Sequence, residues 1–394
     1  KLPPNIIETI LCFLPIQEAA RTSVLSREWR YHWMKIPKLV FIEDAFQVST
    51  DDDGELSDMG QPYDHPSQRN EMIKRGKLFD AIYQVLSMHE DPIHEFTLSM
   101  VTDGSSVEID RVIFLLSQKN TVRKLKLEFI SGYKLSLNIF SSHRLIDLHL
   151  IGCDLDHEPM FNGFGDLVSL YLQEVMVSRK ALLHLLSNCP LLRSVSLHID
   201  HLAFEDGDGS TVINLFECLT MVENLSIGFG IIECFAHGGF PQELPIALVH
   251  LKYLCIKDIC FIHNYGLPAL VLLIKSSPNL EKLKLEILDD SWVEISERRD
   301  SFTLEDDLDI WLEHLKELEI VNMIYRNAEL DFVKVILAKS PMLKKVKIFL
   351  YNEVAKDEAL HISGILEQSP HASPVVDFIV EIIGSSCTSS RSVM

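Results

Sequence analysis

One short phrase of apolar residues recurs ten times in this chain from residue 93 onward. It reads apolar, two variable residues, apolar, one variable residue, apolar, and its first copy is Ile93, Phe96 and Leu98. The steps between copies run from 22 to 35 residues, because the copies begin at Ile93, Val122, Leu145, Leu167, Leu192, Val222, Leu251, Leu280, Leu315 and Leu343. A repeat of this length is typical of a solenoid, in which each unit buries its apolar side only against its neighbours.

Each repeat has two parts with different periods. The last two apolar positions of the phrase alternate with polar ones, as in a strand, while stretches such as Val112, Leu115 and Leu116 have helical spacing. Proline ends several helical stretches, as at residues 188–190 and 339–341. The pattern predicts an α/β fold, a leucine-rich-repeat solenoid with a parallel sheet on the concave side and helices on the convex side. An ordinary doubly wound α/β domain is the alternative, but no glycine-rich phosphate loop follows any strand here.

Residues 1–34 have a different, helical pattern. The first stretch carries five large aliphatic residues: Ile6, Ile7, Ile10, Leu11 and Leu14. A second short apolar element covers residues 19–25, and a third carries Trp29 and Trp33. Three short helices in about 35 residues cannot bury this much apolar surface by themselves. We therefore expect part of the surface to dock on a partner, rather than to cap the solenoid, since a cap has a polar outer face.

The same residues resemble the F-box of plant F-box proteins. The resemblance rests on the Leu2-Pro3 start, the aliphatic helix that follows, and the segment RTSVLSREWRYHW at residues 21–33. It implies that this module binds a Skp-type adaptor, which links it to a cullin. The adaptor-binding residues that it implies are Leu2, Pro3, Ile6, Ile7, Ile10, Leu14, Val24, Leu25, Trp29 and Trp33.

Residues 308–350 resemble the FBD region of plant F-box/FBD/leucine-rich-repeat proteins, through HLKELEI, ELDFVKVIL and SPMLKKVKI. The cysteine and glycine usual in that pattern are absent. The sequence therefore predicts five segments. They are an F-box (1–42), an acidic loop and connecting helix (43–92), leucine-rich repeats (93–307), FBD-like terminal repeats and cap (308–383), and a disordered tail (384–394).

Charge and composition exclude several classes of function. The net charge of −21 argues against nonspecific nucleic-acid binding, which needs a basic field. The eight cysteines lack zinc spacing, and no nucleophile, phosphate-loop or metalloprotease motif is present. We expect no catalysis, no metal and no cofactor. No run of 18 apolar residues indicates a membrane span, and we expect an intracellular protein of the cytoplasm, the nucleus or both.

The residues beside the large apolar ones in each strand are expected to face the concave surface. Seven lysines stand there against five acids. This excess predicts that an acidic segment of a protein substrate binds near Tyr253, Lys257, Lys282, Lys284, Lys345 and Lys347. The alternative is that these lysines are ordinary solvated strand residues.

The expected function is that of the substrate-recognition subunit of a Skp-cullin-F-box (SCF) ubiquitin ligase. Two alternatives remain open. One is a small-molecule, hormone-like receptor with the loop at residues 229–247 as pocket lining, since plant hormone receptors share this architecture. The other is a binding scaffold without ligase coupling.

Overall fold

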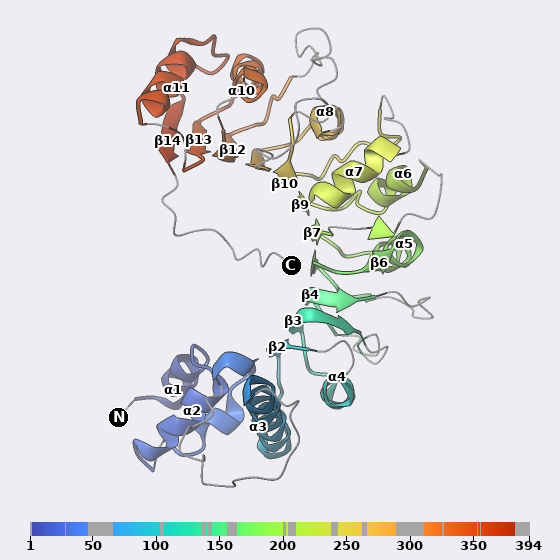
Figure 1. Ribbon diagram of the computed structural model, residues 1–394, viewed down its shortest axis with the longest axis vertical. Helices are drawn as coiled ribbons and strands as arrows, with labels where there is room; N and C mark the ends of the chain where they lie inside the picture. The colour runs from blue at the N-terminus through green and yellow to red at the C-terminus, as the bar shows by residue number, and fades with distance from the viewer. Residues whose placement is uncertain are drawn as a thin grey trace. The chain divides into compact units, whose positions relative to one another are not determined.

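The computed structural model in Figure 1 describes most of the chain. It describes residues 2–27, 29–45, 66–102, 106–135, 139, 144–155, 164–199, 202–203, 210–237, 243–261, 266–288, 311–324, 327–352, 354 and 356–382. Most of the predicted acidic loop and the predicted tail at 384–394 lie outside these residues. Contacts divide the chain into a first unit, Lys1–Leu170 with Glu174–Met176 and Asn188–Pro190, and a second unit, Tyr171–Gln173, Val177–Ser187 and Leu191–Met394.

The first unit begins with short helices. Two α-helices, α1 (Pro4–Leu11) and α2 (Ile16–Arg21), precede the 3-10 helices η1 (Thr22–Val24) and η2 (His32–Lys35). Proline begins α1, where its missing N–H costs nothing, and another proline caps α2. Of the third predicted helix, Trp33 lies in the 3-10 helix η2, whereas Trp29 precedes it. Ile7 and Leu11 on α1 pack inward with Ile16, Ala19 and Ile36.

The first unit continues as a parallel sheet with helices. Its strands are β1 (Lys38–Ile42), β2 (Glu95–Val101), β3 (Lys124–Lys134) and β4 (Asp147–Asp154), paired in that order. Its further helices are η3 (Glu43–Ala45), α3 (Pro66–Met88) and α4 (Val107–Lys119). The apolar phrase also occurs at Ile36, Leu39 and Phe41, and β1 contains its last two residues. These three residues lie within the segment predicted as the F-box (1–42). Strand β5 (Ser169–Gln173) runs from the first unit into the second.

The second unit repeats the same construction. Its parallel strands pair in the order β7 (Ser194–His198), β9 (Asn224–Ile227), β10 (Tyr253–Ile259), β11 (Lys282–Ile287), β12 (Glu317–Met323), β13 (Lys345–Leu350) and β14 (Asp377–Ile382). Its helices are α5 (Arg179–Ser187), α6 (Ser210–Glu217), α7 (Phe229–His237), α8 (Gly266–Lys275), α10 (Asn327–Lys339) and α11 (Lys356–Gln368). A short pair, β6 (Val177–Ser178) and β8 (Leu202–Ala203), completes the unit. The structure thus adds strand β14, which the repeat count missed.

The strand side chains alternate between a buried and a half-exposed face. On β11, Leu283 and Leu285 are buried, whereas Lys282 and Lys284 are half-exposed. The helices of the second unit lie on one side of its strands in Figure 1. We call the half-exposed face of the strands in each unit its open face. This arrangement confirms the predicted α/β class, with a parallel sheet built from the repeat phrase.

One predicted loop is wrong. Residues 229–247 were expected to form a loop that could line a small-molecule pocket, but Phe229–His237 form helix α7. The helix contacts α8 and β10, so its described part is a repeat helix rather than a pocket wall. Residues 238–242 lie outside the described part of the chain.

Candidate functional surfaces

Helix α1 exposes an apolar side to solvent. Ile6 and Ile10 are exposed four residues apart on one side of the helix, and the exposed Leu2 and Phe13 stand just before and just after it. Phe13 is 84% exposed, more than a large aromatic side chain usually is in an isolated domain. Apolar surface of this kind marks an interaction site.

A second exposed apolar group follows α2. Val24, in η1, is 87% exposed and the next residue, Leu25, is 67% exposed. Basic side chains are exposed on the same stretch, at Arg21, Arg27 and Arg30. We call Leu2, Ile6, Ile10, Phe13, Val24 and Leu25 together the N-terminal apolar set.

On the open face of the second unit, β11, β12 and β13 carry alternating signs of charge. Lys282 lies 3.3 Å from Glu319 and 3.5 Å from Glu317 on the next strand. Lys284 lies 3.2 Å from Glu319, and Lys347 lies 2.6 Å from Glu317. Because the glutamates of β12 stand between two rows of lysines, each carboxylate is shared. We call Lys282, Lys284, Glu286, Glu317, Glu319 and Lys347 the ion-paired half.

Ion pairing favours the charged forms of Glu317 and Lys284. Burial alone would raise the pKa of Glu317, but Lys347 and Lys282 hold that pKa below its usual value. Burial would lower the pKa of Lys284, but hydrogen bonding and attraction from Glu286 and Glu319 raise it. The pKa values of Lys284 and Lys347 are thus raised, and Lys282, Lys284 and Lys347 already have carboxylate partners within the chain.

The other half of this open face, on β5 to β10, consists mainly of neutral polar and aromatic groups, with the charged Lys257 also on β10. His198 Nε2 lies 2.7 Å from Ser226 Oγ, and the His198 ring meets the Tyr171 ring edge-on at 5.4 Å. Ser226 and Tyr253 stand close enough to the Cys255 thiol to influence its pKa by hydrogen bonding. We call Tyr171, Ser196, His198, Ser226, Tyr253 and Cys255 the neutral half.

Burial keeps the neutral half uncharged. It lowers the pKa of His198 to about 4, with a further small push from Lys257. Burial also raises the pKa of Cys255 and of Tyr253. His198 Nδ1 is buried, and no described residue gives it a hydrogen-bond partner.

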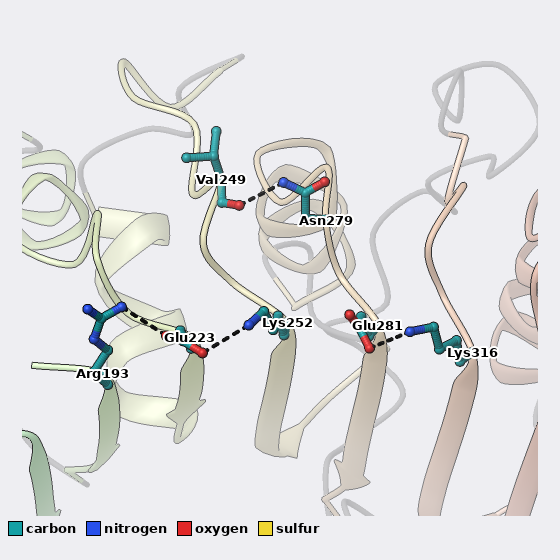
Figure 2. Close-up of polar contacts among 7 residues, drawn as sticks. All are labelled: Arg193, Glu223, Val249, Lys252, Asn279, Glu281 and Lys316. Carbon is teal, nitrogen blue, oxygen red and sulfur yellow. Dashed lines mark hydrogen bonds and ion pairs between the residues drawn. The ribbon is translucent and has the colours of Figure 1, made fainter.

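A third set of charges marks the start of the strands in the second unit, as Figure 2 shows. Glu223 accepts from Arg193 (2.9 Å) and from Lys252 (3.0 Å), and Lys316 donates to Glu281. The partners are 29 to 35 residues apart, which is one repeat. The Lys252 and Arg193 contacts lower the pKa of Glu223. These exposed pairs join neighbouring repeats edge to edge.

The open face of the first unit has a small hollow of about 140 Å³. It is lined by Lys38, Glu95, Phe96, Thr97, Lys124, Leu125, Lys126, Asp147 and His149. Glu95 lies 3.1 Å from Lys124, and Asp147 lies 3.0 Å from His149. The hydrogen bond from His149 lowers the pKa of Asp147. The charges of the hollow are thus largely paired with one another.

Comparison with known proteins gives the same architecture. Residues 1–41 match the F-box domain family. The F-box/FBD/LRR-repeat protein At1g13570 of Arabidopsis thaliana is 26% identical over 392 residues, which are 88% of this chain and 89% of that protein. The chain carries an F-box and is a homologue of plant F-box/FBD/LRR-repeat proteins.

Other similarities cover less. The putative F-box/FBD/LRR-repeat protein At5g62970 of A. thaliana is 24% identical over 65% of this chain and 55% of that protein. The putative F-box protein At3g58860 of A. thaliana is 30% identical over 50% of this chain and 40% of that protein. The solved leucine-rich repeat-containing protein LegL7 of Legionella pneumophila covers 64% of this chain and 83% of its own, at 13% identity. Its TM-score of 0.30 is too low to support a fold assignment.

Most residues proposed from the sequence to bind an adaptor lie at the surface of the F-box. Leu2, Pro3, Ile6, Ile10, Val24 and Leu25 are exposed, and Leu14, Trp29 and Trp33 are half-buried. Ile7 differs, because it is only 1% exposed and packs inside the helices. It belongs to the core of the F-box and not to an outer surface. Phe13 was missed, although its position three residues after Ile10 is a signal that the sequence contains.

The residues expected to bind an acidic substrate lie on the open face, and several of them are engaged within the chain. Tyr253, Lys257, Lys282, Lys284, Lys345 and Lys347 do lie half-exposed on the open face. Three of these lysines, however, are ion-paired with Glu317 and Glu319. Counting charges one by one gave an excess of lysine, whereas aligning the repeat phrases places Lys282, Glu317 and Lys345 side by side. Lys282, Lys284 and Lys347 are thus neutralised locally, whereas no ion pair with a described residue engages Lys257 or Lys345.

Two further classes of site are absent from the part of the chain that the structure describes. It contains no group of three or more histidine, cysteine or acidic side chains that could hold a metal ion. None of its described helices is both long and apolar enough to cross a membrane.

Proposed function

We propose that this chain is the substrate-recognition subunit of an SCF-type ubiquitin ligase. The F-box binds a Skp-type adaptor and through it a cullin, and the open face of the second unit binds a protein substrate. The chain has no catalytic role in this proposal, because it only brings the substrate to the enzymes that transfer ubiquitin. The presence of an F-box and the similarity to F-box/FBD/LRR-repeat proteins support the assignment.

The observation that carries the proposal is the N-terminal apolar set. Six large apolar side chains are exposed within residues matched to the F-box. Fully burying a side chain such as Ile or Phe stabilises a complex by about 1.5–3 kcal/mol. On the adjoining side of α1, Ile7 and Leu11 are buried in the F-box core. Because the apolar face of a helix is normally covered, we infer that a partner covers the exposed part.

The test is copurification with an adaptor. The full chain is co-expressed with a plant Skp-type protein, and the affinity of the complex is measured for wild type and for the double variant Ile6→Glu, Leu25→Glu. We expect at least a tenfold loss of affinity, because two carboxylates would be buried in an apolar contact. Val107→Glu is the matched control, since Val107 is 78% exposed on α4, outside the F-box. Undiminished adaptor binding by the double variant would refute the proposal.

Ligase coupling is tested in cells by proximity labelling with wild type and with the triple variant Leu2→Ala, Pro3→Ala, Ile6→Ala. A variant that keeps its substrate surface but loses its adaptor should accumulate substrates that the wild type clears. Equal recovery of every labelled protein with both chains would point to a scaffold without ligase coupling.

A further inference from the structure

The neutral half of the open face has a floor of small side chains. In register across β7, β9 and β10, the residues Ser196, Ser226 and Cys255 stand side by side. Two inter-strand steps span roughly 10 Å, which is wide enough for an aromatic ring to lie across the three residues. The next residue in the row is Lys284 on β11, where the ion-paired half begins.

Larger side chains stand around this floor. Tyr253 on β10 lies two residues before Cys255, so both are on the same face of the strand. The ring of His198 contacts the ring of Tyr171. Gly228 faces His198, and a Cβ at Gly228 would lie 3.2 Å from His198 Cα. A side chain at Gly228 would crowd this backbone, so the two strands approach closely beside His198. Three rings therefore surround a floor made of two hydroxyls and a thiol.

This part of the face differs in charge from its neighbour. The ion-paired half contains three lysines and three glutamates that satisfy one another. The neutral half keeps a protonated thiol, a protonated phenol and an uncharged imidazole. The nearby cations adjoin the rings and not the floor, since Lys257 acts on His198, and Lys282, already paired with Glu317 and Glu319, lies over the Tyr253 ring. A charged group that docked on the floor itself would lose its hydration. An uncharged group would lose much less.

One group on the neutral half lacks a partner. His198 Nε2 is engaged by Ser226, but Nδ1 is buried and has no hydrogen-bond partner among the described residues. Buried polar atoms without a partner are rare in native proteins and are destabilising. A hydrogen bond from an incoming group would satisfy this atom.

We propose that the neutral half binds an uncharged segment of the substrate protein, with an aromatic side chain over Ser196, Ser226 and Cys255 and a hydrogen bond to His198 Nδ1. This inference rests on the proposed function and names the chemistry of its substrate. Ring edges at Tyr171, His198 and Tyr253 favour an aromatic anchor, since aromatic pairs attract one another beyond their buried area. A protein segment fits better than a small molecule, because most of these side chains stay partly exposed and would not enclose a small ligand.

The experiment uses capped amino acids as probes. The full chain, labelled with ¹⁵N-histidine, is titrated with N-acetyl-tyrosinamide, N-acetyl-alaninamide or N-acetyl-aspartamide carrying a free β-carboxylate. The His198 ring resonances are assigned with His198→Gln. We expect saturable shifts of these resonances with the tyrosine probe, at millimolar Kd for a ligand of this size, and at least tenfold weaker binding of the other two. Equal binding of the aspartate probe, or no saturable shift with the tyrosine probe, would overturn the proposal.

Matched substitutions locate the binding. Ser196→Phe fills the floor and should weaken binding of the tyrosine probe at least tenfold. Ser99→Phe, the same change on the half-exposed face of β2 in the first unit, should leave it unchanged. Circular dichroism and adaptor copurification report whether each variant is folded. If Ser196→Phe is misfolded, the smaller change Ser196→Leu replaces it, with the same expected loss. Adaptor binding does not depend on this face, so failure here is distinguishable from failure of the F-box assignment.

Discussion

His198 is neutral in the folded chain because it is largely buried, and this makes it sensitive to acid. Its pKa is about 4 in the folded state and about 6.5 when exposed in an unfolded chain. Between these values the unfolded chain binds more protons, so the free energy of unfolding decreases as the pH falls from about 6.5 to about 4. The loss due to this one residue is on the order of 1–3 kcal/mol.

Substitution of His198 tests this assignment. In His198→Gln, the difference in urea midpoint between pH 7 and pH 4.5 should be smaller than in wild type, because the group that takes up the proton on unfolding has been removed. His250→Gln is the control, since His250 is exposed just before β10. A variant with an unchanged pH dependence would contradict the burial of the imidazole.

At the scale of the element, β12 joins two rows of lysines. Glu319 lies within 4 Å of Lys282, Lys284 and Lys347, and its side chain is only 14% exposed. Replacement by glutamine leaves each of these three lysines with one carboxylate partner instead of two. We expect Glu319→Gln to lower the free energy of unfolding by about 1–2 kcal/mol, which is more than for an exposed pair. Thermal or urea unfolding measures the change.

A control on β14, two strands away from β12, separates this effect from a general effect of charge. Glu381→Gln, at an exposed position of β14, should change stability by less than about 0.5 kcal/mol. The double variant Lys284→Met, Glu319→Gln should lose less free energy of unfolding than the two single variants lose in sum, because either change alone already breaks the pair. Strict additivity would show that the two side chains do not interact.

The strands were predictable from the sequence because alternation and repeat length are local properties of the chain. The apolar phrase predicted ten of them. It also occurs at Ile36, Leu39 and Phe41, at the start of β1, but these residues were assigned to the F-box because of the resemblance there. The partners of the open-face charges depend on register between strands about 30 residues apart. Aligned phrases contained that register for Lys282 and Glu317, but the geometry of a buried imidazole nitrogen at His198 depends on packing that no pattern encodes.

At the scale of the whole molecule, we expect the stability of each repeat to depend mainly on its contacts with the adjacent repeats. In a repeat array each unit is stabilised by the units beside it, so the effect of a core substitution should decrease with distance along the chain. Leu318 in β12 and Leu98 in β2 are both fully buried residues of the apolar phrase, one in each unit. Truncation of either to alanine should destabilise its surroundings by about 2–5 kcal/mol.

Amide hydrogen exchange of the full chain distinguishes local from global loss. Leu318→Ala should accelerate exchange most in β11, β12 and β13 and least in β1, β2 and β3, and Leu98→Ala should give the opposite pattern. Adaptor binding by the F-box should survive Leu318→Ala, because the N-terminal apolar set and the β12 core lie in different units. The two substitutions thus serve as controls for each other. A uniform rise in exchange from either would mean that the chain unfolds as one cooperative body, and that recognition and adaptor binding cannot be altered independently.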